Sequence, residues 1–385
     1  MATPHPSSDP PLVSVIVPAR NEEASLAQCL ESLVSQTGVS LEIIVVDDAS
    51  TDRTRQIAES FSKVHIIDAP PLPPGWTGKN NALAAGAKAA RGKWLLFTDA
   101  DTVHHAGSLA RSLEEAEQRG AALLSYSPEQ EVHGFWENAI MPVIFAELAC
   151  TYRPSEVCNP TSRAAVANGQ YLLMTRAAYN AVGGHTAVAS SLLEDVALAK
   201  AVKASGLAIF FRFGGDAVRT RMYRSFSQLR EGWTKNLVLL FPSALRLAAL
   251  RVTEFLLIAG STTLTVITFS RGSYRPGIFA AILASVVIAA FFRRIRRAHF
   301  FWTSTALALF GLPIFSYLLL RSRLAHKNGT VTWKGRTYAS LPGRAKAQGV
   351  AAMALKGHGL SRADSSTTSR GFSSRGLNGL FNPQS

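Results

Sequence analysis

Three apolar stretches in the second half of the chain constrain the fold most strongly. Each has about 17 to 21 residues and almost no charge, which matches the roughly 20 helical residues needed to cross a hydrocarbon core. A single stretch of this length is also compatible with a buried helix of a soluble protein. Three in series, flanked by arginines, favour membrane helices. We therefore predict a membrane region over residues 236–322, with helices at Val252–Ser270, Pro276–Phe292 and Phe300–Leu320.

The charge of the chain supports a membrane surface as its partner rather than nucleic acid. The formal net charge is +14 and the isoelectric point is about 10.0. Arginines cluster between the second and third apolar stretches, at 293–297, and a basic segment follows at 323–345. Anionic lipids attract such juxtamembrane charges. The expected localisation is a multi-pass membrane protein whose N-terminal domain lies on the cytoplasmic face.

Three crossings would place the two basic clusters on opposite sides, against the positive-inside rule. Two alternatives remain open from the sequence. In the first, one apolar stretch is re-entrant and is broken at Pro313. In the second, the segment Leu237–Leu250 also spans the membrane. That segment is equally compatible with an amphipathic helix that lies in the membrane interface.

Strand and helix patterns alternate over about the first 100 residues. Short β-branched runs at Val13–Val17 and Ile43–Val46 flank a helical pattern at Glu22–Ser35, which indicates a βαβ unit and a doubly wound α/β domain over residues 12–235. Residues 1–11 and 346–385 have the composition of a disordered leader and tail. Cys29, Cys150 and Cys158 have no metal-binding spacing and indicate a reduced environment.

Two carboxylates follow the buried run Trp94–Phe97. Asp99 and Asp101 would lie at the carboxyl edge of the sheet, where open α/β sheets bind ligands. Two carboxylates and a diphosphate suit Mg²⁺ or Mn²⁺. The alternative is an ordinary Asp-containing turn at a strand end. His104 or His105 is a possible third ligand, although a surface-loop role fits these histidines better.

Three further segments carry polar groups next to expected helix starts. Pro18–Glu22 follows the first strand, and backbone N–H groups there favour a phosphate. Asp47 and Asp48 end the second strand, and Lys79 begins an alanine-rich helix. Each segment also has a simpler interpretation, as a helix cap or a solvated side chain. Glu194 and Asp195 open another helix, where acids are ordinary partners of the helix dipole.

In their order, six motifs resemble glycosyltransferase family 2 with the GT-A fold, in particular membrane-bound members that glycosylate lipids such as carotenoids or hopanoids. The motifs are VSVIVPARNEE, VVDDASTDRT, GWTGKNNAL, FTDADT, ANGQYLLMTRAAYNAVGG and LLEDVALAKAV. The resemblance implies an inverting, metal-dependent transfer from a UDP-sugar to a hydroxyl of a lipid-like acceptor. It implies Asp195 as general base, Asp99 and Asp101 as metal ligands, a nucleotide-sugar site of Pro18, Ala19, Arg20, Glu22, Asp47, Asp48, Lys79 and Asp99, and an acceptor side of Gly169, Gln170, Glu194 and Trp233.

Two departures from the family pattern sharpen this expectation. Processive synthases carry Gln-x-x-Arg-Trp near the membrane, whereas this chain has Gly232 before Trp233, so a single transfer to a lipid fits better than polysaccharide synthesis. A Trp-Lys-Gly-Arg-x-Tyr motif at 333–338 resembles lipid-modifying members, and its basic groups could hold a diphosphate. The alternative functions are polysaccharide synthesis and nucleotidyl transfer on a similar fold.

Overall fold

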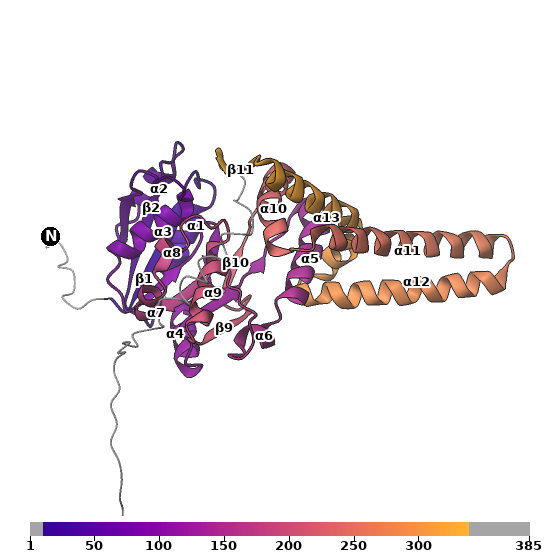
Figure 1. Cartoon of the computed structure of the whole chain (residues 1–385), viewed down its shortest axis with the longest axis horizontal. Coiled ribbons are helices and arrows are strands. Elements are labelled where there is room, and N and C mark those ends of the chain that lie inside the picture. The colour runs from indigo at the N-terminus through magenta and orange to yellow at the C-terminus, as the bar shows by residue number, and fades with distance from the viewer. Residues whose placement is uncertain (1–10, 339–385) are drawn as a thin grey trace, which may run out of the picture. The chain divides into compact units, whose positions relative to one another are not determined.

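The computed structural model describes residues 11–338. The predicted tail, and the predicted leader up to residue 10, therefore lie outside the described residues. A seven-stranded mixed sheet forms the centre of the α/β domain, in the order β3-β2-β1-β4-β8-β6-β9 (Figure 1). Its strands are β1 (Val13–Ala19), β2 (Leu41–Asp47), β3 (Val64–Asp68), β4 (Trp94–Phe97), β6 (Leu123–Ser127), β8 (Leu172–Thr175) and β9 (Ile209–Phe213).

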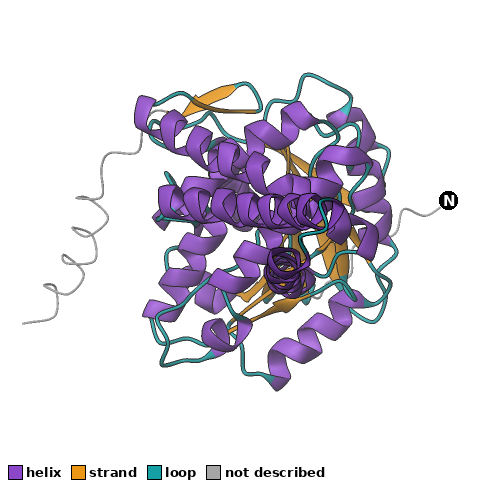
Figure 2. Cartoon of the chain, turned by 90° about the vertical axis from the view of Figure 1, so that its right-hand side faces the viewer, coloured by secondary structure: helices purple, strands orange, loops and turns teal. Residues whose placement is uncertain are grey.

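The strands β3, β2, β1 and β4 are parallel, and β8 is antiparallel to both of its neighbours. Every core strand alternates its side chains between two hydrophobic layers because successive residues of a strand face opposite sides. Helices cover both layers, as Figure 2 shows. One layer holds α1 (Leu26–Val34), α2 (Thr54–Glu59) and α4 (Ser108–Gln118), and the other holds α3 (Gly78–Ala89), α7 (Arg176–Ala181) and α9 (Glu194–Ala204). The predicted doubly wound α/β class is confirmed.

The first helix begins later than predicted, at Leu26 rather than Glu22. Asn21 has a left-handed backbone, with φ of 52°, and the N–H groups of Asn21 and Glu22 donate to Ser50 Oγ and Thr54 Oγ1. These backbone groups are therefore used to join two loops of the sheet edge and do not start a helix.

A small sheet and several short helices complete the site side of the domain. The small sheet has the order β5-β10-β7, from β5 (Thr102–His104), β10 (Val218–Thr220) and β7 (Glu129–Gln130). The short helices are α6 (Pro154–Cys158) and α8 (Gly184–Ala187). Because β5 follows Asp101 directly and pairs with β10, the small sheet fixes the chain on one side of the carboxylate turn.

A helical region follows the α/β domain and contains α10 (Phe226–Leu240), α11 (Ala244–Ser270), α12 (Tyr274–Ile295), a 3₁₀ turn (Arg296–Ala298) and α13 (Trp302–Asn328). Three of them, α11, α12 with its 3₁₀ turn, and α13, are long and apolar enough to cross a membrane. The segment Leu237–Leu250 is not one amphipathic helix, because the chain breaks between α10 and α11 at Phe241–Ser243, where Pro242 lacks an N–H donor. The predicted break at Pro313 is also wrong, since α13 continues through that residue.

The three long helices are buried to different extents. Only 11% of the most apolar window of α11 is buried, against 44% for α13. In Figure 1, α11 and α12 lie side by side and extend away from the sheet as an antiparallel pair. The helix α13 instead packs against α5 (Gly134–Thr151), where Gly311 lies so close to the carbonyl of Ala139 that a Cβ would clash. Thus α13 shares a core with the α/β domain.

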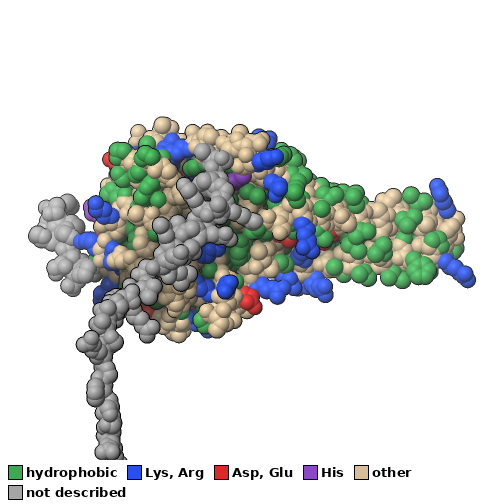
Figure 3. Space-filling view, in the orientation of Figure 1, with side chains coloured by type: hydrophobic (Ala, Val, Ile, Leu, Met, Phe, Trp, Pro, Cys, Tyr) green, Lys and Arg blue, Asp and Glu red, His purple; other side chains and the backbone are tan. Residues whose placement is uncertain are grey.

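A buried ion network fixes the α11–α12 pair to α5. Arg251 and Arg294 both contact Glu147, at 3.2 and 2.8 Å, and both contact Glu254, at 2.6 and 2.7 Å. Arg294, which the sequence placed among the juxtamembrane charges, is therefore an internal partner. Basic side chains also gather at the far end of the pair, whose sides are largely hydrophobic (Figure 3). The pair thus has an apolar surface between two basic ends.

A two-stranded hairpin after α13 returns the chain to the sheet edge. It consists of β11 (Val331–Trp333) and β12 (Arg336–Tyr338), joined by Lys334 and Gly335, which both have positive φ. This turn geometry matches the twist of the strands. The hairpin positions Lys334 and Arg336 over loops that lie about 300 residues earlier in the chain.

Candidate active site

The carboxyl ends of β1, β2 and β4 meet at one edge of the sheet, and the predicted site residues gather there. A cavity of about 1050 Å³ is lined by nearly all of them. Asp47 is the exception: it is buried, accepts a hydrogen bond from the Ser50 N–H at 3.2 Å, and supports the turn after β2. The predicted residues that line the cavity are Pro18, Ala19, Arg20, Glu22, Asp48, Lys79, Asp99, Asp101, Gly169, Gln170, Glu194, Asp195 and Trp233.

A hydrogen-bond network holds the Asp99–Asp101 turn in place. Thr102 Oγ1 donates to the Asp99 carbonyl at 2.7 Å, and Thr220 Oγ1 donates to the Asp101 carbonyl at 3.1 Å. Gln170 Nε2 in turn donates to Thr220 Oγ1 at 3.2 Å. Gln170 is buried and supports the turn from behind. The network fixes the backbone of the turn and leaves its carboxylates available to the cavity.

The two carboxylates of the turn differ in their partners. Asp99 Oδ1 lies 2.8 Å from Lys79 Nζ. Asp101 Oδ1 is buried without a hydrogen-bond partner among residues 11–338. Burial, followed by repulsion from Asp99, raises the pKa of Asp101 to about 7. A buried carboxylate without a partner is costly, so this position fits a cation.

The donor set suits a hard divalent ion that takes most of its ligands from elsewhere. Within the described part of the chain, no group of three or more His, Cys, Asp or Glu side chains could hold a metal. The expectation that His104 lies on a surface loop is wrong. His104 is buried in β5, where its Nε2 lies 3.1 Å from Thr98 Oγ1. Burial lowers its pKa to about 3. Two carboxylates remain, which is the protein contribution typical of Mg²⁺ bound with substrate phosphates.

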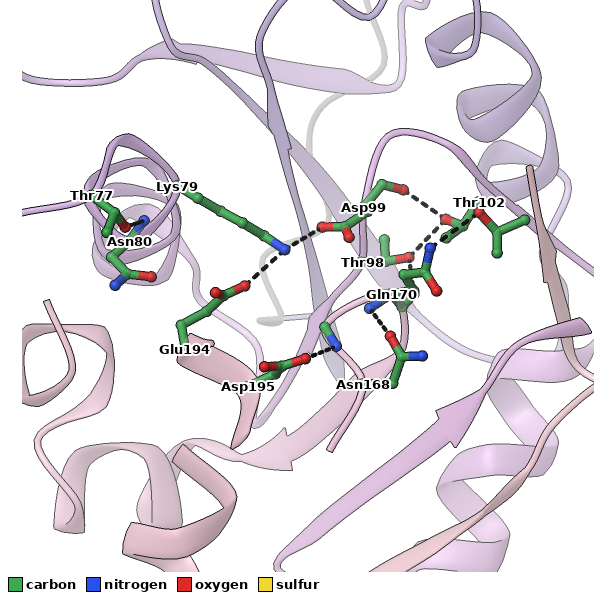
Figure 4. A network of polar contacts seen from close by, with 12 residues as sticks. Thr77, Lys79, Asn80, Thr98, Asp99, Thr102, Asn168, Gln170, Glu194 and Asp195 are labelled. Atoms are coloured by element: carbon green, nitrogen blue, oxygen red, sulfur yellow. Dashed lines mark hydrogen bonds and ion pairs between the residues drawn. The ribbon is translucent and has the colours of Figure 1, made fainter. Parts of the chain in front are cut away.

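Lys79 connects the two halves of the site. Its Nζ lies 2.8 Å from Asp99 Oδ1 and 2.7 Å from Glu194 Oε1 (Figure 4). Burial opposes its charge, but the two carboxylates outweigh burial and raise the pKa of Lys79. The pKa of Glu194 shifts in the opposite direction. Burial disfavours the charge of Glu194, but the neighbouring Lys79 outweighs burial and holds this pKa below its usual range. Both groups are therefore charged at neutral pH.

The helix α3 also positions the start of α9. Thr77 caps α3, with its Oγ1 accepting from the Asn80 N–H at 3.2 Å. The buried Asn80 amide then donates to the carbonyls of Val188, Ala189 and Ser191 at 2.8 to 3.0 Å. These bonds hold the loop before α9. Glu194 and Asp195 consequently enter the cavity from a fixed loop.

Asp195 lies at the N-terminus of α9 with both carboxylate oxygens bound by backbone N–H groups. Gly169 N–H donates to Oδ2 at 2.8 Å, and Val196 N–H donates to Oδ1 at 2.7 Å. Burial, with the adjacent Glu194, raises the pKa of Asp195 to about 6. A Cβ at Gly169 would lie 3.2 Å from Lys79 Nζ, so the glycine leaves room for this ammonium beside Glu194 and Asp195. A fixed carboxylate with this pKa is suited to accept a proton near neutral pH.

The hairpin β11–β12 covers the loops after β1 and β2. Arg336 forms a bidentate contact with the Asp48 carboxylate, with Nη2 at 2.9 Å from Oδ1. Lys334 pairs with Glu22 and donates to the Arg20 carbonyl at 3.2 Å. Arg20 itself donates to the Asp48 carbonyl at 2.6 Å. Sequence reasoning related this basic motif to a diphosphate but could not place it against Asp48 or Glu22.

The remaining wall of the cavity is apolar. Phe145 and Leu148 of α5, Tyr152, and Leu240 of α10 line it together with Trp233. Trp233 is almost fully buried and packs edge-on against Phe145, with ring centroids 6.2 Å apart. One side of α5 thus faces the cavity, while its other side packs on α13. One cavity joins the carboxylates to an apolar surface.

The α/β domain that carries this site is similar in sequence to a known family of enzymes. Residues 14–178 match the family model of glycosyl transferase family 2. The GT-A type of α/β fold predicted from the motifs is thereby confirmed for the domain.

The chain is also similar in sequence to individual proteins. The chain is 33% identical to a 4,4'-diaponeurosporenoate glycosyltransferase of Staphylococcus haemolyticus over 231 residues, which cover 58% of this chain and 60% of that protein. A protein of the same name from Staphylococcus aureus is 29% identical over 233 residues, with the same coverage. The chain thus spans about 60% of the length of these curated relatives. A mannosyltransferase from Pyrobaculum calidifontis, solved in complex with GDP-Man and Mn²⁺, is 18% identical, with a TM-score of 0.48 over 83% of this chain and 87% of that one.

Proposed function

We propose that this protein transfers a sugar from a UDP-sugar to a hydroxyl of a hydrophobic acceptor at the membrane, with inversion and with Mg²⁺ or Mn²⁺ as cofactor. The observation that carries the proposal is the single cavity lined by Asp99, Asp101 and Asp195 on one side and by α5 and α10 on the other. The names of the relatives support a carotenoid-type acceptor.

The donor would bind along the loops after β1, β2 and β4. Asp48 would accept a hydrogen bond from the uracil or ribose, because Arg336 occupies one acceptor position on each of its oxygens and leaves a second one. Lys79 and the basic hairpin residues would lie near the diphosphate. Asp99 and Asp101 would hold the divalent ion, which as a Lewis acid stabilises the charge that develops on the leaving diphosphate.

The acceptor would be activated by Asp195. Its carboxylate takes the proton of the acceptor hydroxyl as that oxygen forms a bond to the anomeric carbon. The bond from this carbon to the diphosphate breaks at the opposite face, so a single displacement inverts the configuration. Glu194 is charged and bound to Lys79, which suits it to orient groups rather than to accept the proton. The apolar wall would shield the acceptor from water.

Nucleotide binding to the purified protein tests the donor part of this proposal. Isothermal titration with UDP, GDP, CDP and ADP in the presence of Mn²⁺ should show tightest binding of UDP, because Asp48 can accept from the uracil imide. Equal binding of all four nucleotides would refute selection for uridine. Binding of none of them would refute the nucleotide site itself.

We also propose that α11 and α12 are the elements that cross the bilayer. The hairpin β11–β12 contacts Arg20 and Asp48, so residues before and after the apolar helices lie on the same side. The number of crossings between them must then be even, which replaces three spans by two. At about 1.5 Å per residue, α11 and α12 are roughly 40 and 33 Å long, enough for a core of about 30 Å. Helix α13 would remain with the catalytic domain, on the cytoplasmic face.

Single-cysteine labelling of a variant without native cysteines tests this topology. We expect Ser273→Cys, between α11 and α12, to react with an impermeant maleimide only from outside intact cells. Lys63→Cys in the α/β domain and Lys327→Cys near the end of α13 should both react only in inside-out vesicles. Both lysines are exposed, so access to the reagent is matched. Labelling of Lys327→Cys from outside would restore an odd number of crossings and refute the proposal.

A further inference from the structure

One turn of α10 presents three polar side chains to the cavity that have no polar partner in the described part of the protein. Trp233, Lys235 and Asn236 all line the cavity. The indole Nε1 of Trp233 and the Oδ1 of Asn236 are buried and form no hydrogen bond within residues 11–338. Buried polar atoms are usually paired, and each unpaired one needs an explanation. Because Oδ1 of Asn236 is an acceptor, the donors that remain for an anionic ligand on this helix are the Trp233 N–H and the Lys235 ammonium.

Lys235 is the charged member of this group. Its ammonium lies 5.1 Å from the centre of the Trp333 ring, on hairpin strand β11, and forms no ion pair with a described residue. Burial lowers the pKa of Lys235, and Glu194 opposes this effect. A half-buried ammonium with an aromatic face on one side still has donor capacity for an anion on the other.

Most other cations of the cavity wall already contact a carboxylate or a backbone carbonyl, whereas Arg297 donates only to Cys150 Sγ, at 3.3 Å. Lys79 contacts Asp99 and Glu194, Lys334 contacts Glu22, and Arg336 contacts Asp48. Arg221 contacts Glu137, and Arg224 donates to the Ala24 carbonyl. Lys235 therefore differs from these paired cations in that its charge is available to an incoming group.

We propose that Lys235 is the charged group of an oxyanion subsite on α10, with the Nε1–H of Trp233 as its neutral donor. This inference rests on the proposed sugar transfer, because that reaction has two substrates that could supply the oxyanion. The two sources are the diphosphate of the donor and an acidic head group of the acceptor. Both present oxygens to N–H donors, and a charge-assisted bond of this kind is the strong type. The subsite extends the reaction centre onto α10.

The test compares Lys235→Gln with Arg230→Gln, a change of another α10 cation that does not line the cavity. Binding is measured by titration of the full-length protein in detergent with four probes: UDP with Mn²⁺, uridine, oleate and oleyl alcohol. Each anionic probe is matched with a neutral one. Trp233→Phe, which keeps an aromatic ring but removes the N–H donor, is the second variant.

If the donor supplies the oxyanion, Lys235→Gln should weaken UDP binding about tenfold and leave uridine unchanged. If the acceptor supplies the oxyanion, Lys235→Gln should weaken oleate binding about tenfold and leave the binding of oleyl alcohol unchanged. Trp233→Phe should weaken binding of the same probe by a smaller factor. A Lys235→Gln protein that binds UDP and oleate as Arg230→Gln does would overturn the subsite. Lys235-dependent binding of oleate, in a wild-type protein that binds no nucleotide, would instead refute the proposed donor and retain the subsite.

Discussion

Replacement of Asp195 by asparagine is expected to reduce sugar transfer by about 10²- to 10⁴-fold, the usual contribution of a general base. Asparagine has nearly the same shape, and its Oδ1 can still accept from the Val196 or Gly169 N–H. It cannot take a proton from an acceptor hydroxyl. Binding of UDP with Mn²⁺ should therefore be retained while turnover is lost. The measurement is transfer of label from a UDP-sugar to lipid, paired with calorimetric UDP binding.

The same residue predicts the pH dependence of the wild type. Burial and Glu194 raise the pKa of Asp195 to about 6, and only the deprotonated carboxylate acts as a base. The transfer rate should thus fall as the pH drops below about 6 and level off above it. In Asp195→Asn this dependence should be absent from the residual rate.

Asp216→Asn is the matched control, because Asp216 is an exposed carboxylate that pairs with Arg212 outside the cavity. It should transfer at the wild-type rate. Full activity of Asp195→Asn would contradict the role of this residue, and equal losses in both variants would show that the change acts through folding.

Replacement of Asp101 by asparagine should weaken Mn²⁺-dependent UDP binding by about 10- to 100-fold, the equivalent of losing one charge-assisted contact of about 1.5–3 kcal/mol. The reason is that Oδ1 of Asp101 is buried without a partner among the described residues, and its carboxylate pKa is raised to about 7 by burial and Asp99. A neutral amide would remove that repulsion, so the folded protein should not be destabilised. Titration of UDP with Mn²⁺ and with a chelator checks the prediction.

The comparison with the chelator separates metal binding from a general effect on the pocket. Wild type and Asp101→Asn should bind UDP equally weakly without metal. If the variant is weaker than wild type only in Mn²⁺, the carboxylate acts through the ion. Equal affinity of both proteins in Mn²⁺ would show that Asp101 is not a ligand.

The sequence allowed the sheet and the carboxylates at its edge to be predicted because both signals are local. Short β-branched runs identified β1 and β2, and the acids that follow β2 and β4 must lie at one edge of a parallel sheet. The acids directly after β2 and β4 could therefore be assigned to the site from the sequence.

Contacts between distant segments could not be predicted in this way. Nothing near Asp48 in the sequence indicates Arg336, and nothing near Lys235 indicates Trp333. The apolar stretch of α13 resembles a membrane span by composition, yet it packs on α5 with Gly311 against a backbone carbonyl. Composition measures how apolar a helix is, and it does not distinguish lipid from protein as the neighbour.

The proposed transferase site joins the carboxylate cluster to the apolar wall in one cavity. The most direct measurement reconstitutes the full-length protein in vesicles of bacterial lipid with a panel of labelled UDP-sugars and follows label in the lipid fraction by mass. We expect one UDP-sugar to label a hydrophobic acceptor, a requirement for Mn²⁺ or Mg²⁺, and a product inverted at the anomeric carbon. Labelled lipid formed equally well with a chelator, or label found only in a water-soluble polymer, would contradict the proposed function.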